Sequence, residues 1–76
     1  MGRRPIAEQL RAWREARGLS QRALAERAKV GYVLVARLEL GQTDPRLSTL
    51  EKLAAALRIS LADLIEGKPA RKRAGR

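Results

Sequence analysis

The stretch SQRALAERAKVGYVLVARLELG, residues 20–41, predicts two short helices joined by a tight turn. Ser20 is suited to begin the first helix, because its hydroxyl can accept a hydrogen bond from a first-turn amide that has no partner within the helix. Apolar residues then recur at helical spacing on both sides of the turn, at Leu24, Ala25 and Ala28 and again at Val35 and Leu38. Gly31 can cap the second helix, and Gly41 can end it in the left-handed conformation. Since two short helices joined so tightly must cross steeply, this stretch is predicted to form a helix-turn-helix.

Further helices are predicted on both sides of this pair, so that the fold is all-α with five helices. Pro5 suits a first helical turn, where its missing N–H is no loss. An apolar stripe follows through Ile6, Leu10 and Trp13 and stops before Gly18. Because Trp13 continues this stripe, core packing is favoured for it over stacking on a base.

Two of the five helices are predicted after the polar loop at residues 42–46. The first of them carries a stripe of apolar residues: Leu47, Leu50, Leu53, Ala54 and Leu57. Ser48 and Glu51 have the spacing of a capping box at its start. Ser60 and Asp63 repeat this spacing before a short last helix.

The helix-turn-helix and its flanks resemble the lambda-repressor/Cro-like family of DNA-binding domains, often called the XRE family. The matching motifs are REARGLSQ (14–21), Leu24-Ala25, Ala28, Val30, Arg37-Leu38-Glu39 and Gly41, followed by Pro45, Leu47, Thr49-Leu50, Lys52-Leu53-Ala54, Ala56-Leu57 and Ile59-Ser60. They cover roughly residues 5–66, most of the chain. The resemblance implies a compact lambda-repressor-like DNA-binding domain over residues 5–67. Residues 1–4 are expected to form a basic arm, and residues 68–76 a disordered basic tail.

The positive net charge of the chain indicates a polyanion as its binding partner. The chain holds 17 Lys and Arg against 8 Asp and Glu, which gives a net charge of +9. Residues 1–17 carry +3, residues 18–41 carry +2, residues 42–67 carry −1 and residues 68–76 carry +5. A basic surface attracts polyanions of any kind. Combined with the helix-turn-helix, it favours double-stranded DNA over an anionic membrane.

The residue types that most metal sites and many active sites need are missing. The sequence has no cysteine and no histidine, which excludes disulfides and thiolate metal sites. Without paired carboxylates or a phosphate-binding loop, neither enzyme activity nor a cofactor is expected. No apolar run approaches the ~20 residues that span a bilayer, and the first residues lack the apolar core of a signal peptide. A cytoplasmic protein with no membrane contact is therefore expected, and the resemblance implies a protein of bacterial or phage type that is associated with the nucleoid.

The second helix of the pair, at about residues 31–39, is expected to read the major groove of DNA. The resemblance places base contacts on its outward side chains: Tyr32, Val33, Ala36 and Arg37. Arg37 can donate a bidentate pair of hydrogen bonds to guanine O6 and N7, with simple phosphate binding as the alternative. Tyr32 can donate its hydroxyl to a phosphate or a base, and Val33 can contact a thymine methyl.

This helix is less polar than the base-reading helices of the family usually are. Only Tyr32 and Arg37 have polar side chains on the presumed reading surface. Direct readout is therefore expected to be sparse, so that specificity depends on DNA shape or on few bases. The apolar surface also leaves room for a protein partner, since exposed aliphatic clusters often mark interfaces. Leu34 is expected to cover the edge of the core instead.

Four side chains around the recognition helix are candidates for contacts with the DNA backbone: Gln21, Arg22, Lys29 and Arg46. The resemblance places a phosphate on Gln21, beside the N-terminal amides of its helix. For Arg22 and Lys29, an exposed solvated charge is an equal alternative. Lys29 also stands where the family usually has glycine, so the turn is expected to force a positive φ at a cost of ~1 kcal/mol.

The resemblance further implies a structural pair between Arg14 and Glu39, which would clamp the first helix to the recognition helix. Removing one partner of a partly buried ion pair costs ~3–5 kcal/mol, because the other charge is left without a partner.

The leading interpretation is a sequence-specific DNA-binding transcriptional regulator, a repressor or a small controller protein, that acts as a homodimer on an inverted repeat. Family members this short have no separate dimerisation domain, so the last helix is expected to form the interface through Leu61, Leu64 and Ile65. The alternative is an antitoxin-like or adaptor module whose apolar recognition helix binds a partner protein. A third interpretation is non-specific coating of nucleic acid through the basic tails.

Overall fold

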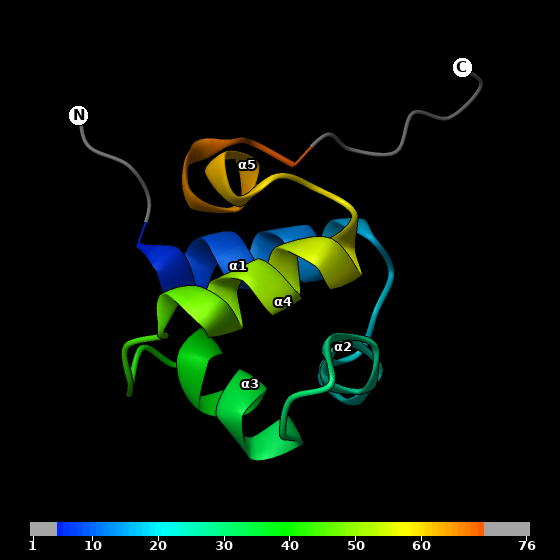
Figure 1. Ribbon diagram of the computed structural model, residues 1–76, viewed down its shortest axis with the longest axis vertical. Coiled ribbons are helices and arrows are strands. Elements are labelled where there is room, and N and C mark those ends of the chain that lie inside the picture. The colour runs from blue at the N-terminus through cyan, green and yellow to red at the C-terminus, as the bar shows by residue number, and fades with distance from the viewer. Residues whose placement is uncertain (1–4, 70–76) are drawn as a thin grey trace.

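Five helices and no strand make up residues 5–69, the part of the chain that the computed structural model describes. They are α1 (Ile6–Ala16), α2 (Gln21–Ala28), α3 (Tyr32–Glu39), α4 (Leu47–Leu57) and α5 (Leu61–Glu66). The predicted all-α fold with five helices is confirmed (Figure 1). The basic arm predicted at residues 1–4 lies outside the described residues, as does the tail at 68–76 apart from Lys68 and Pro69.

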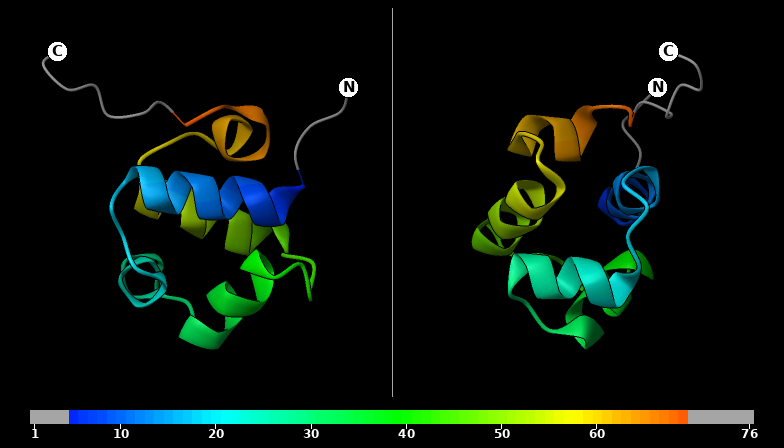
Figure 2. Two further views of the ribbon diagram at one scale, coloured as in Figure 1. Left: turned by 180° about the vertical axis from the view of Figure 1, so that it is seen from behind. Right: turned by 90° about the vertical axis from the view of Figure 1, so that its right-hand side faces the viewer.

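Helices α2 and α3 lie together at one end of the molecule, and α5 lies at the other end, with α1 and α4 between them (Figure 1 and Figure 2). Helix α3 packs against both α1 and α2, while α2 also packs against α4. Helix α5 packs against α1 and α4 from the opposite side. The two eleven-residue helices, α1 and α4, therefore form the scaffold that carries the helix-turn-helix.

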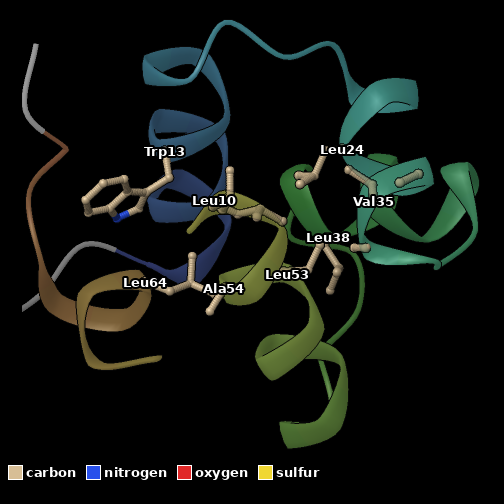
Figure 3. Packing of buried hydrophobic residues seen from close by; sticks show 11 residues of the cluster. Leu10, Trp13, Leu24, Val35, Leu38, Leu53, Ala54 and Leu64 are labelled. Atoms are coloured by element: carbon tan, nitrogen blue, oxygen red, sulfur yellow. The ribbon is translucent and has the colours of Figure 1, made fainter. Parts of the chain in front are cut away.

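One hydrophobic core joins all five helices. Its buried side chains are Leu10 and Trp13 of α1, Leu24, Ala25 and Ala28 of α2, Val35 and Leu38 of α3, Leu53, Ala54 and Leu57 of α4, and Leu64 of α5 (Figure 3). Trp13 is 6% exposed, which confirms its predicted place in the core. Leu34 is half-buried and packs against this cluster, as predicted.

Two serines begin helices by capping them with their side chains. The Oγ of Ser20 accepts a hydrogen bond from the Ala23 N–H at 3.0 Å, and the Oγ of Ser60 accepts one from the Asp63 N–H at 2.9 Å. Each satisfies an amide that the first helical turn leaves without a partner, a contribution of about 1 kcal/mol. Both predicted caps are confirmed.

The capping box predicted at the start of α4 is wrong. Helix α4 begins at Leu47, and Arg46, in an extended conformation, is its N-cap without a side-chain cap bond. Ser48 therefore lies inside the first turn. The Leu50 N–H donates to the Arg46 carbonyl at 3.0 Å, and the Leu50 side chain packs against the core. Helix α4 thus begins before Ser48, without the capping box.

Left-handed residues end several of the helices. Lys29 ends α2 with φ 60°, which confirms the predicted positive φ at a residue that carries a Cβ. Gly41, after α3, has φ 72°, also as predicted. Arg58 ends α4 with φ 61°, a conformation that its sequence context did not predict.

Polar side chains of α1 hold the C-terminal end of α5. Gln9, 2% exposed, donates through Nε2 to the backbone oxygens of Leu64 at 3.2 Å and Gly67 at 2.6 Å. The indole Nε1 of Trp13 donates to the Asp63 carbonyl at 3.0 Å. The last carbonyls of a helix have no partner within it. Helix α1 supplies a donor to the Leu64 carbonyl in this way, whereas the Asp63 carbonyl also accepts from the Gly67 N–H at 2.7 Å.

Leu64 belongs to the core, so its predicted place in a dimer interface is wrong. Its side chain is 0% exposed, because this side of α5 faces α1 and α4. Leu61 and Ile65, the other two predicted interface residues, are half-buried.

Candidate nucleic-acid interface

Helix α3 has one side in the core and the other at the surface. Its buried side chains are Val35 and Leu38. The opposite side carries the four predicted reading residues, of which one, Ala36, is half-buried and the others are exposed: Tyr32, Val33, Ala36 and Arg37. The structure therefore brings these four together on one accessible surface.

The turn between α2 and α3 leaves the start of α3 accessible. Gly31 is the N-cap of α3, as predicted, in an extended conformation and without a side-chain cap bond. Open space surrounds the position where a Cβ of Gly31 would lie. Figure 1 shows this turn at the end of the molecule that is opposite α5. The first turn of α3 can thus approach a large partner without obstruction from the body of the domain.

A hollow opens beside the first turn of α2. Five residues from three helices and one loop line it: Arg14, Ser20, Gln21, Arg22 and Tyr32. The backbone N–H groups at a helix N-terminus point away from the helix, and the positive end of its dipole favours an anion. With the guanidinium of Arg22 at its edge, the hollow has the chemistry to bind a phosphate oxygen.

The predicted pair of Arg14 and Glu39 is present, and Arg14 also lines this hollow. Arg14 donates to the Glu39 carboxylate twice, from Nε at 2.6 Å and from a terminal nitrogen at 3.0 Å. Its other terminal nitrogen donates to the Leu19 carbonyl at 2.7 Å. The side chains of Arg14 and Glu39 are only 13% and 3% exposed. The hydrogen bond to Glu39 raises the pKa of the Arg14 guanidinium above its ordinary value, against the opposing effect of burial.

Gln21, which is predicted to contact the DNA backbone, is hydrogen-bonded to the same pair. Its Nε2 donates to the Glu39 carboxylate at 3.0 Å. One carboxylate therefore accepts from both α1 and α2 while it belongs to the last residue of α3. This network fixes the relative positions of the three helices at the candidate interface.

Arg22 and Tyr32 make a contact that sequence reasoning did not find. The guanidinium carbon of Arg22 lies over the Tyr32 ring, 4.4 Å from its centroid. Each residue stands at the beginning of its helix, and this shared position is the one feature of the sequence that could have indicated the contact. A cation over an aromatic face at this distance is attracted by the ring quadrupole.

The other two predicted backbone contacts are exposed and lie at helix ends. Lys29 is the last residue before the turn that leads to α3, and Arg46 is the N-cap of α4, after the loop that follows α3. They therefore lie on the two chain segments that flank the recognition helix.

Within residues 5–69, no group of three or more acidic, histidine or cysteine side chains is placed to hold a metal ion. Over the same residues, no helix has the length and the apolar character that crossing a membrane requires.

A comparison with models of protein families gives a match to the helix-turn-helix family HTH_3 over residues 10–64, from α1 through α5. The match covers well over half of the chain. The chain belongs to this family. It is the XRE family of DNA-binding helix-turn-helix proteins, and the relatives that match this chain include transcriptional regulators and a repressor.

Relatives with known names include an HTH-type transcriptional regulator, DdrOP3 of Deinococcus deserti. It is 39% identical over 62 residues, which are 82% of this chain and 48% of the relative. The immunity repressor protein of Bacillus phage phi105 is 35% identical over 60 residues, 79% of this chain and 42% of the relative. This helix-turn-helix chain spans about half the length of the curated relatives it matches.

Solved structures with the same fold include two repressor or controller proteins. The restriction-modification controller protein C.AhdI from Aeromonas hydrophila superposes with a TM-score of 0.78 at 36% identity, over 80% of this chain and 92% of that protein. The DNA-binding domain of the P22 c2 repressor superposes with a TM-score of 0.83 at 27% identity, over 96% of each chain. The P22 c2 repressor was also solved in complex with a synthetic operator, with a TM-score of 0.75 at 29% identity over 86% of this chain and 98% of that one.

Proposed function

We propose that this chain is a sequence-specific double-stranded DNA-binding transcriptional regulator, a repressor or a small controller protein. The observation that supports it best is the accessible outer side of α3, held by the buried side of the same helix. An α-helix fits the major groove, and the residues near its N-terminus then face the base edges. The similar P22 c2 repressor was solved in complex with a synthetic operator, which supports DNA as the partner.

The reading residues have different chemistry. Arg37 donates to guanine O6 and N7, and Val33, which is 58% exposed, contacts a thymine methyl. Tyr32, at the start of the helix, offers its hydroxyl to a base or a phosphate. Ala36 is small, which lets the helix approach the base edges closely.

Contacts with the sugar-phosphate backbone hold the helix in register. Gln21 and Arg22 bind one phosphate at the hollow beside α2, together with the N-terminal amides of that helix. Lys29 and Arg46 bind phosphates on either side of the recognition helix. Each such contact adds to affinity and to its dependence on salt.

The protein acts as a homodimer on an inverted repeat. A single α3 specifies few base pairs, and two copies related by a two-fold axis double that number. Because Leu64 lies in the core, the interface on α5 is reduced to Leu61 and Ile65.

The chain organisation follows from this function. Residues 5–67 form the DNA-binding domain, and the basic segments at 1–4 and 68–76 add attraction to DNA. The chain itself has no enzyme activity. It works where the DNA is, in the cytoplasm of a bacterium or of a phage-infected cell, associated with the nucleoid.

A module that only binds proteins is not favoured, because the matching relatives are transcriptional regulators. Selection of binding sites from a random DNA library tests the proposal. Enrichment of an inverted repeat with half-site centres ~34 Å apart is the expected result. Binding of all sequences without enrichment would instead indicate non-specific coating, and absence of DNA binding would contradict the proposed function.

A further inference from the structure

We propose that Arg22 and Tyr32 act as one unit in DNA binding, in which the ring of Tyr32 is a positioning element for a phosphate contact of Arg22. This inference rests on the proposed function and gives Tyr32 a role different from base reading alone. The two residues come from different helices, Arg22 from the first turn of α2 and Tyr32 from the first position of α3. Their contact therefore spans the turn of the helix-turn-helix.

The geometry leaves Arg22 able to bind a phosphate while it is held. Its guanidinium carbon lies over the face of the Tyr32 ring, 4.4 Å from the ring centroid. All N–H donors of a guanidinium lie in its plane and point outward from its edge. With five N–H donors, the guanidinium keeps donors for a phosphate while it rests on the ring.

The position of the pair points to an anion. Both side chains line the hollow beside the N-terminus of α2, where Gln21 is held by its own bond to Glu39. An exposed arginine loses rotamer freedom when it binds a phosphate, and this loss weakens binding. A guanidinium that already rests on a ring in the unbound protein loses less. Tyr32 is 39% exposed, so its ring is accessible enough to hold Arg22 at the surface that meets the DNA.

This arrangement distinguishes two roles of Tyr32. If the ring positions Arg22, its removal weakens binding to every DNA sequence equally, because phosphates carry no sequence information. If Tyr32 acts only through base contacts, its removal weakens binding to the specific site and leaves non-specific binding unchanged.

A double-mutant cycle tests the unit: wild type, Arg22→Gln, Tyr32→Leu and the double variant. The probes are a duplex taken from the site selection and a random-sequence duplex of equal length. We expect Tyr32→Leu to weaken binding to both duplexes by about two- to fivefold, the range for an exposed cation–π pair. Arg22→Gln is expected to lower the slope of log affinity against log salt by about one. In the Arg22→Gln background, Tyr32→Leu should have no further effect on the random duplex.

Two controls separate positioning from a change in folding. Tyr32→Phe keeps the aromatic ring that positions Arg22. Its affinity for the random duplex should therefore be that of the wild type. Arg27→Gln removes a charge from the same helix, and in that background Tyr32→Leu should weaken binding by its full factor. Melting temperatures of all variants check that each domain is folded.

Three results would overturn the inference. The first is a loss of affinity on Tyr32→Leu that is as large in the Arg22→Gln background as in the wild type. The second is a loss of affinity on Tyr32→Leu for the selected duplex but not for the random duplex. The third is a Tyr32→Phe variant that behaves like Tyr32→Leu on the random duplex. If the wild type binds neither duplex, the proposed function itself fails. The other three results contradict only the role of Tyr32 in positioning Arg22.

Discussion

Arg37 stands on the exposed side of α3, directly before the buried Leu38, so its contribution to binding can be separated from the fold. We expect Arg37→Ala to weaken binding to the selected site by ~1–3 kcal/mol, the value of one bidentate base contact. The melting temperature should change little. Competition binding on the selected and the random duplex measures the difference. An equal loss on both duplexes would mean that Arg37 binds only phosphate.

Lys29 ends α2 with φ 60°, a conformation in which its Cβ is strained. We expect Lys29→Gly to stabilise the domain by up to ~1 kcal/mol, because glycine adopts this backbone without the steric cost. Thermal unfolding by circular dichroism would then show a rise of a few degrees, as roughly 4–8 °C per kcal/mol applies to a domain of this size.

Two variants serve as controls for Lys29→Gly. Lys29→Ala removes the charge but keeps the Cβ, so it should not stabilise the domain. Arg58→Gly replaces the other left-handed residue, at φ 61°, and should stabilise it similarly. An unchanged or lowered melting temperature in Lys29→Gly would show that a contact of the lysine outweighs the strain.

Two residue-level features were predicted on different grounds. The Ser20 cap follows from its local pattern, the left-handed Lys29 follows from the position of a glycine in the family, and both are confirmed. The left-handed Arg58 had neither signal and was not predicted. The stack of Arg22 on Tyr32 depends on how the turn brings two helix starts together and on the conformation of a long flexible side chain. No periodicity in the sequence encodes that distance.

At the scale of elements, the joint between α1 and α5 shows why a short helix is difficult to orient from sequence. In the six residues of α5, the stripe Leu61, Leu64 and Ile65 indicates one apolar side but not which side chain is deepest. The bonds from Gln9 and Trp13 to the end of α5 accompany the burial of Leu64 in the core. The sequence gives no sign that Gln9 is buried, since a buried glutamine is recognised only from its distant partners.

This joint is open to a direct test of stability. Gln9→Ala leaves the carbonyls of Leu64 and Gly67 without their donor, which we expect to destabilise the domain by ~1–3 kcal/mol. Urea unfolding followed by the fluorescence of Trp13, the one tryptophan in the chain, measures the change. The exposed neighbour variant Glu8→Ala should stay within ~0.5 kcal/mol of the wild type. Equal midpoints for Gln9→Ala and the wild type would mean that water replaces the lost bonds at no cost.

At the scale of the whole molecule, the arrangement of the helices agrees with a domain that meets DNA at one end. The helix-turn-helix lies opposite α5 (Figure 2), and residues 42–67, which include α4 and α5, carry a net −1 while the chain carries +9. Residues 68–76, which follow α5 in the sequence, carry +5, so net charge alone does not distinguish the two ends for a polyanion. The end at α5 is the one on which a second copy would leave both recognition helices free.

This arrangement leads to the prediction for the assembly. If two copies meet through α5, Ile65→Glu should give a folded monomer, because Ile65 is half-buried and a charge there disrupts an apolar interface. Leu64→Glu should unfold the domain, since Leu64 is fully buried and an unpaired charge in the core costs more than ~4 kcal/mol. Sedimentation equilibrium measures the assembly, and circular dichroism measures the fold.

The matched control for the assembly is Leu47→Glu, at the start of α4. Leu47 is 60% exposed and Leu40, across the same loop, is 69% exposed, so a charge at this site is tolerated by the monomer fold. Leu47→Glu should remain a dimer if α5 is the interface. A monomer with Leu47→Glu and a dimer with Ile65→Glu would move the interface to the loop between α3 and α4. A wild-type protein that is a strict monomer and occupies a single half-site would contradict the dimer. One recognition helix with few polar reading residues specifies few base pairs, so the dimer model needs two linked recognition helices to select an inverted repeat.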